Sequence, residues 1–130
     1  MIKVLIVSPH EEPKVAIIDS SFNTLRKVVS IGSYELVNVR SKKVGNGVYI
    51  VYADDGILYD LEPNKNVGNE VICGTVIVLA VNSEGYATSL TDYQVNKYTK
   101  LFSRDEKLRF SDAITSWSKK YERELEEMSV

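Results

Sequence analysis

Residues 71–81 read VICGTVIVLAV, and this stretch decides the fold. Its second half, TVIVLAV, is far shorter than a membrane span requires. Its residues are apolar on both faces of a strand, which is typical of a strand in the interior of a sheet. We therefore predict that residues 71–81 form a central strand.

Strand patterns also dominate the residues that precede this stretch. KVLIV at 3–7 and KVAII at 14–18 are short β-branched runs separated by a turn that contains proline, which predicts a hairpin. YELVNVR at 34–40 is a further strand pattern with imperfect alternation. On the other side of the central stretch, NSEG at 82–85 turns the chain toward YATSL.

Residues 44–61, VGNGVYIVYADDGILYDL, contain two turn signals. The dipeptides Asn-Gly at 46–47 and Asp-Gly at 55–56 both suit the positive φ angles of a tight hairpin turn. Between these turns, the side chains from Val48 to Ala53 alternate between two faces. We predict a three-stranded meander over this segment.

The sequence predicts two helices before residue 103. After the first hairpin, apolar residues recur at helical spacing from Phe22, and Gly32 is a fitting helix stop. LTDYQV at 90–95 has the threonine and the glutamine of a capping box three residues apart, so the second helix begins at Asp92. The polar stretch SRDEKLRF at 103–110 is then either a linker or a continuation of this second helix.

The C-terminal residues SDAITSWSKKYERELEEMSV predict a third helix with Ser111 as its N-cap. Its apolar residues are spaced 3, 4, 4 and 3 residues apart and form a narrow seam on an otherwise charged helix. The seam consists of Ile114, Trp117, Tyr121, Leu125 and Met128. Such a seam either packs on the sheet of its own chain or pairs with a second chain or a host protein.

These patterns together predict an α+β protein. We expect a mostly antiparallel sheet of five to six strands, one helix after the first hairpin and two helices at the C-terminus. A chain of 130 residues is long enough for one hydrophobic core. We divide it into an α+β domain over residues 1–103 and a linker with an amphipathic helix over residues 104–130, which packs on that domain or serves association.

Charge and cysteine content limit the classes of protein that fit. The 16 basic and 18 acidic residues give a net charge of −2, which provides no general attraction to nucleic acid or anionic lipid. Cys73 has no second cysteine to pair with, which fits a reducing compartment. We interpret MIKVLIVSPH at the N-terminus as the first strand rather than a signal peptide, and expect a cytoplasmic protein without membrane association.

Few residues carry catalytic chemistry. His10, the sole histidine, falls in a turn where a surface residue is expected rather than a general base. Cys73 lies in the most apolar strand, where a thiol serves as a small hydrophobe. Asp54 and Asp55 are the candidate carboxylate pair, but Gly56 favours a turn at this position. We expect no cofactor, no metal site and no catalytic residue.

The polar stretch LEPNKNV at 61–67 is the most site-like feature of the sequence. Pro63 and Asn64 suit a turn without any further role, whereas a turn does not require Lys65. The connection that contains them, residues 62–70, is longer than a minimal hairpin turn, and longer loops more often carry recognition. Pro63, Asn64 and Lys65 therefore form either a partner-binding loop or a purely structural turn.

A second candidate binding site is basic. Lys97, Lys100, Arg104 and Lys107 are spaced 3, 4 and 3 residues apart, and they share one stripe if the second helix continues past Phe102. Such a stripe either is a solvated helix face or holds phosphates or an acidic partner surface.

Three segments of the chain resemble a small uncharacterised domain family, a domain of unknown function. They read LYDLEPNKNV, VICGTVIVLAV and ATSLTDYQVNKYTKLF, and they contain Pro63-Asn64-Lys65, Gly74-Thr75 and Ser89-Leu90-Thr91; Lys3 in the first strand also fits. The resemblance covers about residues 1–103, and Lys65 departs from the arginine usual in the family. It implies a context of bacteriophages, plasmids and other mobile elements of Gram-positive bacteria.

Three functions are compatible with these observations. We expect a non-enzymatic binding protein that acts on a host protein, with a defence nuclease as a candidate, through the 62–70 loop and a C-terminal helix. It would act in the cytoplasm of the bacterial host, as a monomer or as a homodimer formed through the C-terminal helix. The alternatives are a nucleic-acid accessory protein that uses the basic helix, and a small carboxylate-dependent enzyme.

Overall fold

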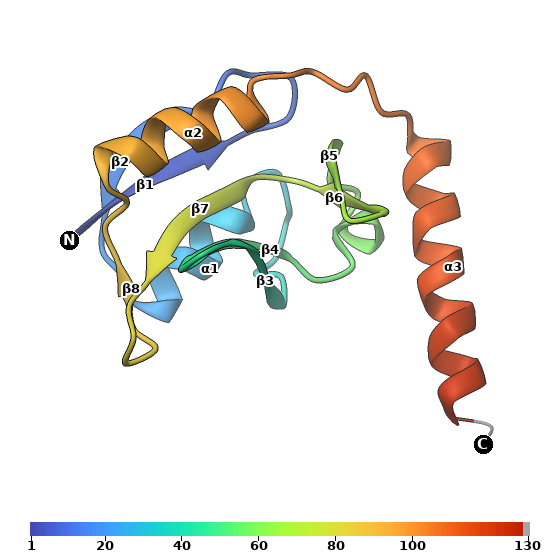
Figure 1. The fold of residues 1–130 in the computed structure, drawn as a ribbon. Coiled ribbons are helices and arrows are strands. Elements are labelled where there is room, and N and C mark those ends of the chain that lie inside the picture. Colours follow the sequence, from blue (N-terminus) through green and yellow to red (C-terminus); the bar gives the residue numbers. More distant parts are fainter. Residues whose placement is uncertain (129–130) are drawn as a thin grey trace.

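The computed structural model describes residues 1–128 and confirms the α+β class. Figure 1 shows the order of the elements along the chain. The strands are β1 (Ile2–Val7), β2 (Lys14–Ile18), β3 (Val39–Gly45), β4 (Val48–Ala53), β5 (Pro63–Val67), β6 (Glu70–Cys73), β7 (Val76–Val81) and β8 (Ala87–Thr88). The helices are α1 (Phe22–Val29), the 3-10 turn η1 (Gly56–Tyr59), α2 (Asp92–Phe102) and α3 (Phe110–Met128).

An antiparallel sheet with strand order β2-β1-β7-β4-β3 forms the centre of the molecule, and β8 pairs with the end of β7. The strand predicted to be central is β7, which pairs with β1 on one side and with β4 on the other. The predicted first hairpin is confirmed as β1–β2, with Ile2 opposite Ile18.

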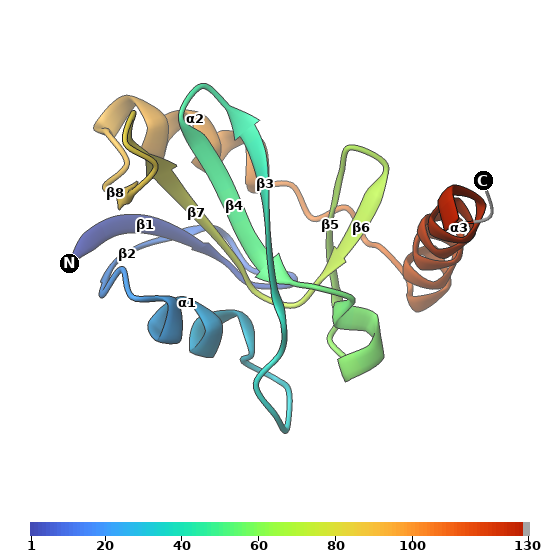
Figure 2. The same ribbon diagram turned by 90° about the horizontal axis from the view of Figure 1, so that it is seen from below.

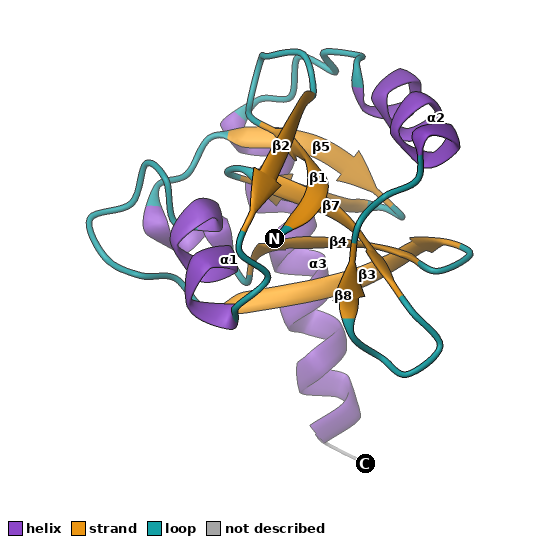
Figure 3. Ribbon diagram, turned by 90° about the vertical axis from the view of Figure 1, so that its left-hand side faces the viewer, coloured by secondary structure: helices purple, strands orange, loops and turns teal. Residues whose placement is uncertain are grey.

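Helices cover both faces of the sheet, so that there are two apolar layers (Figure 2). On the α1 side, Val4, Val51 and Ile77 pack against Leu25 and Val29 of the helix. On the other side, the core contains Leu5, Val7, Val48, Ile50, Val76, Val78, Tyr98 and Phe102, the last two from α2. Figure 3 shows the strands between the two helices. This arrangement explains why residues 76–81 are apolar in both alternating positions.

The predicted helix signals before residue 103 are confirmed. Ser21 caps α1 by accepting a hydrogen bond from the backbone N–H of Thr24. Thr91 and Gln94 form the reciprocal capping box, and α2 begins at Asp92. Because α2 ends at Phe102, residues 103–109 are a non-helical linker. The predicted N-cap at Ser111 is wrong, because α3 begins one residue earlier and the carboxylate of Asp112 accepts a hydrogen bond from the N–H of Arg109.

One predicted strand is confirmed only at its end, and another is wrong: of the predicted strand 34–40, only Val39 and Arg40 belong to β3. Residues 34–38 are a loop, which is held by hydrogen bonds from the Val37 N–H to Ser30 and from the Arg26 side chain to the Val37 carbonyl. The predicted third strand of the meander, after residue 56, is instead η1. Both edges of β4 are already paired, with β3 and with β7, so a third meander strand has no free edge to join. The chain packs on β6 instead, where a Cβ added to Gly56 would lie 2.7 Å from the carbonyl oxygen of Cys73.

The predicted 62–70 loop is also wrong, since residues 63–67 are β5 and pair with β6. The turn of this hairpin is formed by Gly68 and Asn69, with φ angles of 56° and 67°. Residues 71–81 accordingly form two strands, because Gly74 at φ 91° bends the chain between β6 and β7. The bend lets the β5–β6 hairpin leave the sheet and meet α3 (Figure 1).

Candidate functional site

Asn64 of β5 is buried, with 3% of its surface exposed. Its side-chain amide donates hydrogen bonds of 2.8 Å to the carbonyl oxygens of Val7 and Gly74. Two acceptors fix the amide orientation, because only its NH₂ group can donate twice. The side chain therefore connects the end of β1 to the bend between β6 and β7.

Lys65, the next residue, is also 3% exposed. Its ammonium group donates to the backbone carbonyl of Arg104, which places the linker over β5. The sequence thus singled out Lys65 and Arg104, and the structure brings them together, though through the backbone of Arg104. Pro63 is half-buried and pairs with Cys73. None of these contacts shows partner binding, and that role for Pro63, Asn64 and Lys65 stays a prediction.

His10 lies in the turn between β1 and β2, as predicted, with half of its side chain exposed. Its Nδ1 atom is 3.3 Å from Asp105 of the linker, and its Nε2 atom is 3.9 Å from Glu62. The pKa of Asp105 is lowered, chiefly by a hydrogen bond from the backbone N–H of Lys107 and also by His10. These exposed contacts hold the linker against the first turn.

The predicted basic stripe does not form one helix face. Lys97 and Lys100 are exposed on α2, with the Lys97 ammonium group 5.6 Å from the centre of the Tyr98 ring. Arg104 and Lys107 follow the end of the helix and lie in the linker, where Lys107 has a positive φ of 51°. The four charges therefore do not share the regular spacing that a continuous helix would give.

The β5–β6 hairpin and α3 lie side by side and are held together by the C-terminal segment. Asn66 and Val71 face each other in the hairpin, and the N–H of each points outward to a strand edge. Glu106 of the linker accepts the hydrogen bond from Asn66 at 2.8 Å, and Ser116 of α3 accepts the one from Val71 at 2.9 Å. Both edges of the hairpin are thus capped by side chains that follow residue 103.

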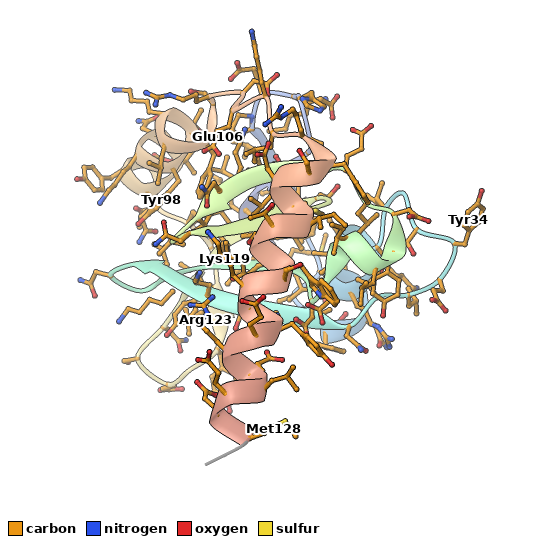
Figure 4. All side chains as sticks on the ribbon, turned by 90° about the vertical axis from the view of Figure 1, so that its right-hand side faces the viewer. Tyr34, Tyr98, Glu106, Lys119, Arg123 and Met128 are labelled. Carbon is orange, nitrogen blue, oxygen red and sulfur yellow. The ribbon has the colours of Figure 1, made fainter. Side chains whose placement is uncertain are left out.

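A groove of about 660 Å³ runs between this hairpin and α3 and is open to solvent. We call it the hairpin groove. Figure 4 shows Lys119 and Arg123 leaving α3 toward the hairpin side. The hairpin contributes Asn66, Asn69 and Val71 to its lining, and α3 contributes Asp112, Thr115, Ser116, Lys119, Glu122, Arg123 and Glu126. The α3 side of the groove carries both acidic and basic side chains.

Beside the hairpin groove lies a cluster of charged residues. Lys120 of α3 is 3.3 Å from Asp54 and 3.2 Å from Asp55, and Arg40 is 3.6 Å from Asp54. Burial lowers the pKa of Lys120, but its hydrogen bond to Asp55 and the nearby carboxylates outweigh that effect and raise it. Asp54 and Asp55, the candidate carboxylate pair, therefore form salt bridges with Lys120 of α3. This contact was not predicted from the sequence.

Tyr52 lies at the base of this cluster, and its pKa is raised to about 12, chiefly by burial and further by Glu70. Tyr52 is therefore a neutral hydroxyl at physiological pH. Lys42 is 3.4 Å from Glu70, which completes the chain of charge contacts from β3 to β6. Within residues 1–128, no group of three or more histidine, cysteine or carboxylate side chains is arranged to hold a metal ion.

Cys73 is buried as predicted, and burial raises its pKa to about 11. We expect its thiol in the folded protein to react with a small alkylating reagent about 100-fold more slowly at neutral pH than in urea, because thiolate is the reactive form. Reaction kinetics followed by mass spectrometry measure this. Equal rates in the two conditions would contradict the burial of Cys73.

The predicted association residues on α3 differ in their exposure. Trp117 is half-buried against the α1-side core and stacks on Tyr121, with ring centres 5.5 Å apart. Ile114, Tyr121 and Leu125 are 42%, 50% and 47% exposed. The helix contacts the rest of the chain mainly through β6 and η1.

Comparison with known proteins identifies a family without a known activity. Residues 2–103 match the family described as Domain of unknown function (DUF3846). No curated protein and no solved structure matches the chain. The match ends where the linker begins, so α3 and its side of the hairpin groove lie outside the matched region. No helix within residues 1–128 is long and apolar enough to cross a membrane.

Proposed function

The chain belongs to the DUF3846 family, whose function is unknown, and we propose that this member is a non-enzymatic binding protein that holds a segment of another protein in the hairpin groove. The observation that carries the proposal is the groove itself. Its volume is about 660 Å³, it is open to solvent, and charged side chains of α3 line one side of it. Open grooves with alternating charges favour an extended polypeptide, whereas small molecules bind in enclosed apolar pockets.

The partner that we propose is a host protein, with a nuclease of a bacterial defence system as the first candidate. This choice is supported by the resemblance to a family of bacteriophages and mobile elements, whose small proteins often act on host machinery. Occupation of a partner's surface would suffice for inhibition. The surface expected from the sequence combined the 62–70 segment with a C-terminal helix, and the β5–β6 hairpin that this segment forms is adjacent to α3 (Figure 4).

The test is affinity capture from a lysate of the bacterial host, followed by mass spectrometry, with and without added nuclease. The groove variant carries Lys119→Ala and Arg123→Ala, because alanine preserves the helix. The matched variant removes the same charge from α2, with Lys97→Ala and Lys100→Ala. We expect one host protein to be captured by the wild type and the α2 variant and to be reduced about tenfold or more by the groove variant.

The outcomes distinguish the proposed function from its alternatives. If the captured host protein is lost after nuclease treatment, and also lost with the α2 variant, the result would favour a nucleic-acid accessory protein. Recovery of no specific protein, or equal recovery with the groove variant, would contradict binding through the hairpin groove.

A further inference from the structure

The strongest unexplained feature of the surface is the apolar seam of α3. Ile114, Tyr121, Leu125 and Met128 are exposed by 42%, 50%, 47% and 80%. Half-exposed large hydrophobic side chains in one row mark a surface that is covered in the working state. Trp117 belongs to the same row and stacks on Tyr121, which extends the flat aromatic part of the seam.

The seam is separate from both other contacts of α3. The helix packs on the hairpin and η1 mainly through Ala113, Ser116 and Trp117. The hairpin groove is lined by residues that recur at spacings of three and four on another face, such as Thr115, Lys119, Glu122 and Glu126. Trp117 belongs both to the contact with the chain and to the seam.

The apolar side chains in the second half of the seam are exposed: Tyr121 by 50%, Leu125 by 47% and Met128 by 80%. Figures 1 and 4 show the end of α3 extending past the hairpin, away from the sheet. Every residue from Tyr121 to Met128 is exposed. A helix whose apolar face is exposed along half its length is stabilised when a partner buries that face.

The spacing of the seam identifies the partner. Counted from Tyr121, the other seam residues lie 7 and 4 positions before it and 4 and 7 positions after it. An isologous contact requires a patch that matches itself after a two-fold rotation. In an antiparallel pair of α3 helices with Tyr121 on the axis, Trp117 of one copy faces Leu125 of the other, and Ile114 faces Met128.

Repulsion between the acidic C-terminal ends disfavours a parallel pair and favours the antiparallel direction. The stretch 113–121 contains Lys119 and Lys120 without an acidic residue, whereas 122–128 contains four glutamates and a single arginine. A parallel pair would place the acidic ends side by side, where each also faces the negative end of a helix dipole. An antiparallel pair separates the two acidic ends and places each beside the N-terminal half of the other helix, where the positive end of the helix dipole lies.

From this combination we infer that the chain forms an antiparallel homodimer through the α3 seam. Burial of the four exposed seam residues on both copies removes on the order of 1,000 Å² from water, about the smallest area of a specific dimer interface. The hairpin groove is on a different face of α3 and stays open on each copy. The dimer therefore has two open hairpin grooves, and the inference that it forms does not depend on the proposed function.

Sedimentation velocity from about 1 to about 200 µM measures the assembly. We expect a concentration-dependent dimer for the full chain and a monomer for Tyr121→Ala with Leu125→Ala. The control, Lys119→Ala with Glu122→Ala, changes the groove face of the same helix and should dimerise as the wild type does. Because alanine favours helix, circular dichroism should show the same helix content in all three proteins.

Thiol crosslinking tests the direction of the helices, and the buried Cys73 does not interfere. With a short thiol-to-thiol reagent, Tyr121→Cys should crosslink to itself, because position 121 lies on the two-fold axis. Ile114→Cys should not crosslink alone but should do so when mixed with Met128→Cys. A monomer at all concentrations, a dimer insensitive to the seam variant, or self-crosslinking at position 114 would each overturn the inference.

Discussion

Replacement of Asn64 by alanine is expected to lower the free energy of unfolding by about 3 kcal/mol, because it removes the donor to two carbonyl oxygens at once. The side chain donates to Val7 and to Gly74 inside the molecule. Each buried acceptor that loses its partner costs about 1–3 kcal/mol. Urea unfolding measures the change, and the melting temperature should fall by about 10 °C.

The matched control lies two residues away in the same strand. Asn66 has an exposed side chain, and only its backbone N–H is bonded, to Glu106. Asn66→Ala should therefore change stability by less than about 0.5 kcal/mol. If Asn64→Ala were no more destabilising than this control, the amide would not hold β1 to the bend, and a recognition role for Asn64 would regain support.

The isosteric variant Asn64→Asp separates the loss of the donors from the loss of packing. Its carboxylate would face two carbonyl oxygens, which disfavours the charged form and raises the pKa of that group in the folded state above its unfolded value of about 4. Above about pH 4 the introduced carboxyl group ionises readily in the unfolded chain but not in the folded protein, so the folded state loses stability relative to the unfolded state as the pH rises. Relative to the wild type, Asn64→Asp should therefore lose more stability at pH 7 than at pH 4.

Local signals predicted much of the sheet and the helices. The capping box at Thr91 and the alternation from Val48 to Ala53 reflect contacts between near neighbours in the sequence, and the structure contains both. β5 was missed because PNKNV consists of residues typical of turns, and its strand form depends on pairing with β6. Gly68-Asn69 was the overlooked signal, since this dipeptide between two short runs suits a two-residue hairpin turn.

The candidate site was predictable only in part. The sequence singled out the residues around Asn64 and the seam of α3, and the structure places the β5–β6 hairpin beside that helix. Sequence spacing could not show that Asn64 and Lys65 are buried, because the segment that covers Lys65 lies about 40 positions later in the chain. The pairing of Lys120 with Asp54 and Asp55 depends on the same long-range packing.

Replacement of Gly74 by alanine is the second substitution with a large expected effect. Gly74 has a φ of 91°, and an added Cβ would lie 2.8 Å from Cδ1 of Leu61, whose side chain is buried. The left-handed backbone alone costs alanine about 1–2 kcal/mol. Displacement of Leu61 in a packed core adds about 1–3 kcal/mol. We expect a total loss of about 3 kcal/mol in urea unfolding.

Gly85→Ala is the control that separates the two contributions. Gly85 has nearly the same φ, 88°, but nothing lies within 4 Å of an added Cβ. Its substitution should therefore cost only the backbone contribution. Equal losses at the two glycines would mean that Leu61 yields easily, and that the bend tolerates a side chain.

Asn64 and Gly74 should also be coupled, since the Asn64 amide bonds the carbonyl of Gly74 itself. In a protein that already carries Asn64→Ala, this hydrogen bond is absent, so Gly74→Ala can no longer weaken it by shifting the bend. The double variant should therefore lose less stability than the sum of the two single variants, by about 1 kcal/mol. Strict additivity would show that the two residues act independently, and the bend that directs the β5–β6 hairpin toward α3 would then depend on Gly74 alone.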